Sequence, residues 1–99
     1  MGLPSMYKVI ISPKAQTEIE NIYRYIAIEK ENDFAANRTI EAINTRILSL
    51  SQSPEATAIS EAHPKFRVAH AKRYKIFYRV NKAKKTVTIA RVVHSLQNY

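Results

Sequence analysis

The chain has 99 residues, of which 45% are hydrophobic and 24% charged, with a net charge of +8 and no cysteine. This length and composition predict one folded domain over residues 1–99. The lack of cysteine excludes disulfides, thiolate nucleophiles and cysteine-based zinc sites, and is typical of a cytoplasmic protein. No apolar run approaches the roughly 18 residues that a membrane span needs, and the first residues lack the pattern of a signal peptide.

Residues 7–11 are β-branched and aromatic, which predicts a first strand. This strand stops at Ser12 and Pro13, where serine can cap a helix and proline can open its first turn. We expect this helix to reach about Lys30 and a second helix to begin at Asn32 or Asp33. Apolar residues form a continuous stripe along the second helix: Ala36, Ile40, Ile43, Ile47 and Leu50. The two amphipathic helices, joined by a short polar link, predict an antiparallel hairpin.

Three further strands are expected after a polar loop, at residues 66–69, 74–80 and 86–93. Alternation in the middle strand places Tyr74, Ile76, Tyr78 and Val80 on one face. Alternation in the last strand places Val87, Ile89, Arg91 and Val93 on one face. The expected fold is α+β in the order β-α-α-β-β-β, with the helical hairpin packed on one face of a mostly antiparallel four-stranded sheet. The other face is expected to be partly open and basic.

Charge is distributed very unevenly along the chain. Residues 1–61 contain six basic and eight acidic side chains, whereas residues 62–99 contain ten Lys or Arg and no acid. This asymmetry favours a negatively charged partner, either a nucleic acid, the ribosome or an acidic protein segment. A basic surface kept for solubility is the plainer interpretation.

Few kinds of catalytic site are compatible with this composition. The three histidines have no metal-binding spacing, the single glycine excludes a phosphate-binding loop, and the basic half has no paired carboxylates. We therefore expect no metal and no cofactor. The remaining chemistry is cationic: Lys65 and Arg67 on one strand, Lys75 and Arg79 on the next, and His94 at the end. Such residues could bind RNA phosphates and stabilise a pentacovalent transition state, with His94 moving a proton.

Four segments resemble the RelE/ParE toxin superfamily: residues 7–15, residues 18–26, residues 50–54, and the ending from Arg67 through residues 74–80 to residues 87–94. The resemblance covers about residues 6–99, so residues 1–5 are expected to be a variable or disordered start. It implies a growth-inhibiting toxin of a type II toxin–antitoxin, or plasmid stabilisation, module. It also implies a hetero-oligomer with a cognate antitoxin, whose acidic segment would wrap around the helical hairpin and the sheet.

The superfamily has two branches with different targets. ParE-like toxins poison DNA gyrase without a nuclease site, and we favour this branch. RelE-like toxins are metal-independent mRNA interferases on the ribosome, and here the arginine expected after the last strand falls on Ser95 or Leu96. A plain nucleic-acid-binding module is a third alternative.

The two branches imply different roles for the same cations. For a nuclease, the resemblance implies Arg67 and Lys75 as transition-state cations and His94 as the proton carrier. RNA or another target would be bound by the remaining candidates: Lys65, Arg73, Arg79 and Arg91.

Overall fold

The structure is a computed structural model that describes residues 6–97, so the expected variable start at residues 1–5 lies outside the described residues. The elements follow the order β1 (Lys8–Ile11), α1 (Pro13–Arg24), η1 (Tyr25–Glu29), α2 (Asp33–Ser49), β2 (Arg67–Ala71), β3 (Tyr74–Asn81) and β4 (Thr86–His94). The strands form one sheet in the order β1-β4-β3-β2. Only the β1–β4 pair is parallel among the described strands, and the other pairs are antiparallel. The predicted α+β fold and element order are confirmed.

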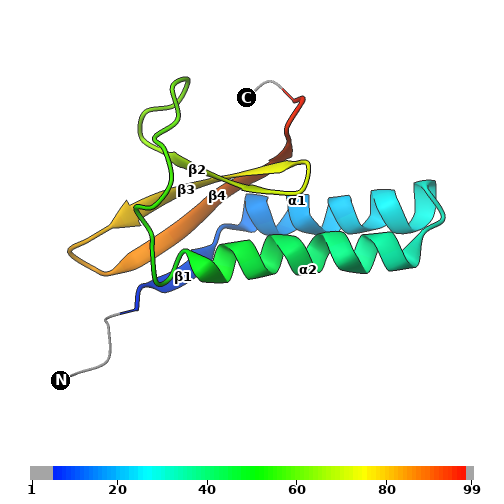
Figure 1. Cartoon of the computed structure of the whole chain (residues 1–99), viewed down its shortest axis with the longest axis horizontal. Coiled ribbons are helices and arrows are strands. Elements are labelled where there is room, and N and C mark those ends of the chain that lie inside the picture. Colours follow the sequence, from blue (N-terminus) through cyan, green and yellow to red (C-terminus); the bar gives the residue numbers. More distant parts are fainter. Residues whose placement is uncertain (1–5, 98–99) are drawn as a thin grey trace.

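Local signals begin both helices, and end the first, where the sequence predicted. The Ser12 hydroxyl accepts a hydrogen bond from the Ala15 N–H at 3.1 Å, and α1 continues through the π-helical turn η1. Glu31 then adopts a left-handed backbone conformation with φ 49°, which ends the helix. Asn32 caps α2 by accepting from the Ala35 N–H at 2.9 Å. Both helices lie side by side on one face of the sheet (Figure 1). Within residues 6–97, no helix is long and apolar enough to cross a membrane.

The hydrophobic core lies between the helical hairpin and the sheet. The predicted stripe on α2 faces it, with Ala36, Ile43, Ile47 and Leu50 buried and Ile40 partly buried. On the sheet side, Tyr78 is fully buried and its phenol donates a hydrogen bond to the Pro54 carbonyl at 2.7 Å. The Thr57 hydroxyl also lies 2.5 Å from this phenol. Tyr78 therefore attaches the connection after α2 to the core.

Two sequence predictions about the strands were wrong in detail. β2 begins at Arg67 and extends to Ala71, so Lys65 lies in the turn before the strand and does not share a strand face with Arg67. In β4 the pairing with β3 steps from Tyr78↔Ile89 to Phe77↔Arg91, which leaves Ala90 as an extra, bulged residue. This bulge breaks the expected alternation, because Val92 rather than Arg91 joins Val87 and Ile89 in the core.

The sheet face away from the helices is less open than expected. Phe77 and Val93 on this face are 4% and 3% exposed. The connection between α2 and β2 passes to this side (Figure 1), and the His63 ring lies 6.3 Å from Phe77 and 6.5 Å from Phe66. The middle of the face is thus apolar and covered, while basic residues such as Arg79 remain exposed around it.

Candidate functional site

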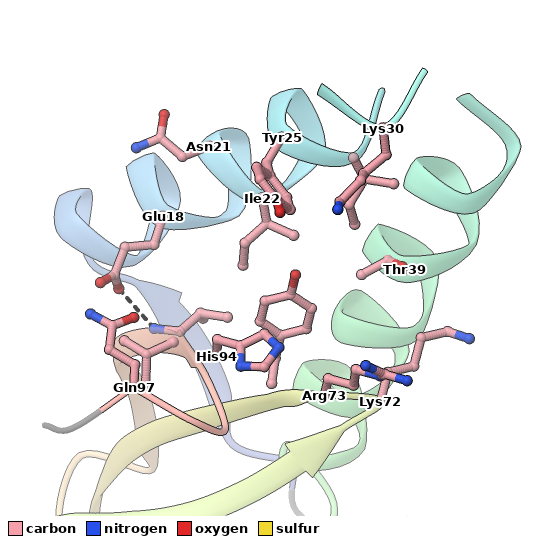
Figure 2. Close-up of a pocket in the computed structure, with 14 residues that line it drawn as sticks. Glu18, Asn21, Ile22, Tyr25, Lys30, Thr39, Lys72, Arg73, His94 and Gln97 are labelled. Carbon is pink, nitrogen blue, oxygen red and sulfur yellow. Dashed lines mark hydrogen bonds between the residues drawn. The ribbon is translucent and has the colours of Figure 1, made fainter. Parts of the chain in front are cut away.

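A groove of about 890 Å³ opens between the helical hairpin and one end of the sheet. One wall comes from α1, η1 and α2, and the other from the end of β4 and the turn between β2 and β3 (Figure 2). Ile22, Ile26 and Val92 give the lining an apolar part. The cations of the lining are Lys30, Lys72 and Arg73, and its aromatic and imidazole rings are Tyr25, Tyr74 and His94.

The groove exists because β1 is much shorter than β4. β1 pairs only with residues 86–89, since the Ser12-Pro13 sequence turns the chain into α1. Among the residues that the structure describes, residues 90–94 of β4 therefore lack a strand neighbour on that side. The Ser12 hydroxyl donates to the Ala90 carbonyl at 3.1 Å, and the Glu18 carboxylate accepts from the Val92 N–H at 2.8 Å (Figure 2). The side chains of Ser12, which caps α1, and of Glu18 within α1 thus take the place of a strand at two points, and the groove opens beside them.

Glu18 also forms the best-protected ion pair of the described chain. Its Oε2 lies 2.7 Å from Arg91 Nη2 and 2.8 Å from Arg91 Nε, and the two side chains are only 18% and 17% exposed. The carboxylate therefore holds both the backbone and a side chain of β4. Sequence analysis missed Glu18, because its partners lie 73 and 74 residues away in the chain.

The rim of the groove is cationic. Lys72 and Arg73 form the β2–β3 turn, and Lys72 has a left-handed backbone conformation with φ 51°. The Ser95 N–H and hydroxyl both donate to the Arg73 carbonyl, at 2.7 and 2.9 Å. On the opposite wall, the Lys30 ammonium lies 5.5 Å from the centre of the Tyr25 ring. An apolar lining with a cationic rim fits a ligand that carries both apolar and acidic groups.

Tyr74 and His94 pack against each other in the groove, with ring centroids 5.4 Å apart. Burial raises the pKa of the Tyr74 phenol, Tyr25 acts in the same direction, and Arg73 opposes them. The phenol is therefore protonated at neutral pH and suited to donate a hydrogen bond rather than to act as a base. His94 Nδ1 accepts a hydrogen bond from the Leu96 N–H at 3.1 Å.

Comparison with known proteins identifies the family to which the chain belongs. Residues 9–99 match the family described as the ParE toxin of type II toxin–antitoxin systems, parDE. The chain belongs to the ParE toxin family. No curated protein matches this ParE-family chain significantly.

Solved structures confirm the fold of this family. The chromosomal ParDE toxin–antitoxin system from P. aeruginosa is 21% identical, with a TM-score of 0.75 over 91% of this chain and 97% of that chain. The RelBE2 complex from Mycobacterium tuberculosis is 19% identical, with a TM-score of 0.68 over 95% of this chain and 97% of that chain. A double mutant of the E. coli toxin RelE in the free state is 16% identical, with a TM-score of 0.66 over 92% of this chain and 85% of that chain. At these identities the likeness establishes a shared fold.

The three residues predicted for a nuclease site in this ParE-family toxin are not brought together. Arg67 pairs in register with Tyr78 and so lies on the helix side of the sheet, where its Nη1 donates to the Thr57 carbonyl at 2.5 Å. Lys75 pairs with His70 and Val93 on the opposite face. His94 pairs with Tyr74, at the other end of β3 from the partner of Arg67.

The predicted target-binding residues of the toxin are also dispersed. Arg73 lies on the rim of the groove, whereas Arg91 is paired with Glu18. Lys65 is exposed in the turn before β2, and the exposed Arg79 places its guanidinium 5.9 Å above the Phe66 ring. The structure thus separates these cations into a group at the groove and a group at the opposite end of the sheet.

Proposed function

We propose that the chain is the growth-inhibiting toxin of a type II toxin–antitoxin module, and that it acts by binding DNA gyrase rather than by cutting RNA. The observation that supports gyrase binding over RNA cleavage is the separation of Arg67, Lys75 and His94 in the fold. Metal-free RNA cleavage needs a proton carrier and phosphate-binding cations around a single phosphodiester. Here Lys75 lies on one face of the sheet and Arg67 on the other. A toxin that acts by docking has no such requirement.

The contacts of Arg67 also favour a structural role. Its guanidinium binds the Thr57 carbonyl, lies 3.5 Å from the Glu55 carboxylate, and is only 22% exposed. Glu55 and Thr57 belong to the connection between α2 and β2. Arg67 therefore stabilises this connection, and a guanidinium held in this way has few donors left for a phosphate.

We assign the antitoxin to the groove. An extended antitoxin segment can lie in the groove alongside residues 90–94 of β4, beyond the end of β1. Its apolar side chains would contact Ile22 and Val92, and its acidic side chains would meet Lys72 and Arg73. This placement uses both the apolar lining of the groove and the charge of its rim.

Expression in growing bacteria without antitoxin tests the target. The parent should produce gyrase-dependent DNA breaks and leave mRNA 5′ ends unchanged. Lys75→Ala and His94→Ala should retain growth arrest, whereas loss of a general acid or base from a nuclease costs about 10²–10⁴-fold in rate. In-frame cuts confined to translated messages, and lost in these two variants, would instead identify a ribosome-dependent nuclease. Arg67→Ala is unsuitable here, because it would also loosen the connection after α2.

Charge reversal on the rim tests whether the antitoxin binds in the groove. The variant Arg73→Glu with Lys30→Glu should bind the antitoxin encoded beside the toxin at least about tenfold more weakly, because like charges would meet across the interface. Growth arrest without antitoxin should persist. The matched control, Lys14→Glu with Arg24→Glu, changes two exposed cations outside the groove. Equal neutralisation of both variants in co-expression would place the antitoxin elsewhere.

A further inference from the structure

Six cations gather at the end of the sheet opposite the groove, and we call them the basic end: Lys8, Lys65, Arg79, Lys82, Lys84 and Lys85. All six are exposed. Lys8 pairs in register with Thr86 and its N–H donates to the Lys85 carbonyl at 2.9 Å, while the turn between β3 and β4 projects beyond the sheet (Figure 1). β4 runs from this end to His94 in the groove, so the two surfaces are separated by roughly 26 Å at about 3.3 Å per residue.

The positive charge of the basic end is largely uncompensated. Lys82 lies 3.1 Å from the Glu55 carboxylate, which also pairs with Arg67. Within residues 6–97, the other five cations of the basic end form no ion pair. A basic face kept for solubility is normally interspersed with acids, which limits self-repulsion. Here the repulsion remains, and an anionic partner would relieve it.

The β3–β4 turn holds its lysines in place. The Asn81 side-chain oxygen accepts from the Lys84 N–H at 3.0 Å. Lys85 has φ 52°, in the left-handed region that glycine occupies most readily. A lysine at this position adds a charge at a conformational cost that glycine would avoid. An unfavourable backbone conformation retained in this way is an observation that points to function.

The surroundings of the basic end favour the backbone of a duplex over single-stranded bases. Two rings adjoin the basic end along the chain: Tyr7, beside Lys8, packs against the core, and Phe66, beside Lys65, lies beneath the Arg79 guanidinium. Both rings are partly buried, so neither offers an open face on which bases could stack. A projecting two-stranded ribbon fits the major groove of a duplex, and its cations can reach phosphates on either side.

We propose that the basic end binds the phosphate backbone of duplex DNA. Its use by the toxin rests on the proposed function, because a gyrase poison acts where the enzyme holds duplex DNA. The toxin would then contact the DNA with one end of the sheet and leave the groove at the other end for the antitoxin. Binding would be independent of base sequence and strongly dependent on salt.

Fluorescence anisotropy with the full chain and a short labelled DNA duplex tests the proposal between about 50 and 200 mM salt. The variant Lys8→Gln, Lys84→Gln, Lys85→Asn removes three charges, with asparagine chosen because it tolerates the left-handed conformation. The matched control is Lys14→Gln, Arg24→Gln, Arg38→Gln, which removes three exposed charges from the helices. The slope of log K against log salt should fall in magnitude by about 2.7 in the basic-end variant, at about 0.9 per phosphate contact. It should be unchanged in the control.

Three results would overturn the proposal: no duplex binding by the parent at about 50 mM salt, equal weakening by the control variant, or tighter binding of single-stranded RNA of the same length. Circular dichroism of both variants checks that they are folded. If the parent cuts mRNA but its basic-end variant loses duplex binding, the proposed function is refuted and the inference about the basic end is supported. Gyrase-dependent breaks by a toxin that does not bind duplex DNA would refute only the inference.

Discussion

Ile43→Asp should lower the free energy of unfolding by about 3–5 kcal/mol, because it buries an unpaired carboxylate in the core. Ile43 is 0% exposed and lies in the middle of the α2 stripe, where its neighbours in the core are apolar. A domain of this size has a total stability of about 5–15 kcal/mol, so the variant should be close to unfolding. Urea denaturation followed by circular dichroism measures the effect.

Leu48→Asp is the control, because Leu48 lies on the same helix but is 65% exposed. This variant should stay within about 0.5 kcal/mol of the parent. Ile43→Ala gives a graded version of the core change and should cost about 2–4 kcal/mol. If Ile43→Asp unfolded at the urea concentration of the parent, Ile43 could not be a core residue.

Glu18→Ala should lower the free energy of unfolding by about 2–3 kcal/mol. Removing one partner of a fully buried ion pair costs more, but here both side chains retain some solvent contact. The substitution leaves the Arg91 guanidinium and the Val92 N–H without the carboxylate that they share. Both losses occur beyond the last residue of β4 that pairs with β1, so the groove wall should loosen. Hydrogen exchange at the Val92 amide reports this directly, beside urea denaturation.

Two controls separate the parts of this effect. Glu18→Gln keeps an acceptor for the Val92 N–H while removing the charge, and should cost about half as much as the alanine variant. Glu20→Ala changes an exposed carboxylate two residues along the helix, which accepts a hydrogen bond from the Gln16 amide at 3.3 Å, and should be within about 0.5 kcal/mol of the parent. A double-mutant cycle with Arg91→Ala should give a coupling above about 1 kcal/mol. Strict additivity would contradict the pairing.

Features that depend on neighbouring residues could be predicted from the sequence. Ser12-Pro13 marks the end of β1 and the start of α1, and Asn32 marks the start of α2, since a cap acts within three residues. The apolar stripe of α2 has the period of a helix, which identifies the face that packs on the sheet. The element order and fold class follow from these local patterns taken together, whereas the superfamily was indicated by the resemblance of whole segments such as residues 7–15 and 18–26.

The candidate site depends on contacts that no local pattern contains. The bulge at Ala90 reverses the faces of β4, because side chains alternate and one extra residue exchanges the two sides. The same alternation puts Arg67 and Lys75 on opposite faces, although both are cations on adjacent strands. The charge of residues 62–99 was evident from composition alone. Its division between the groove and the basic end was decided by strand pairing, because pairing determines which end of the sheet each cation reaches.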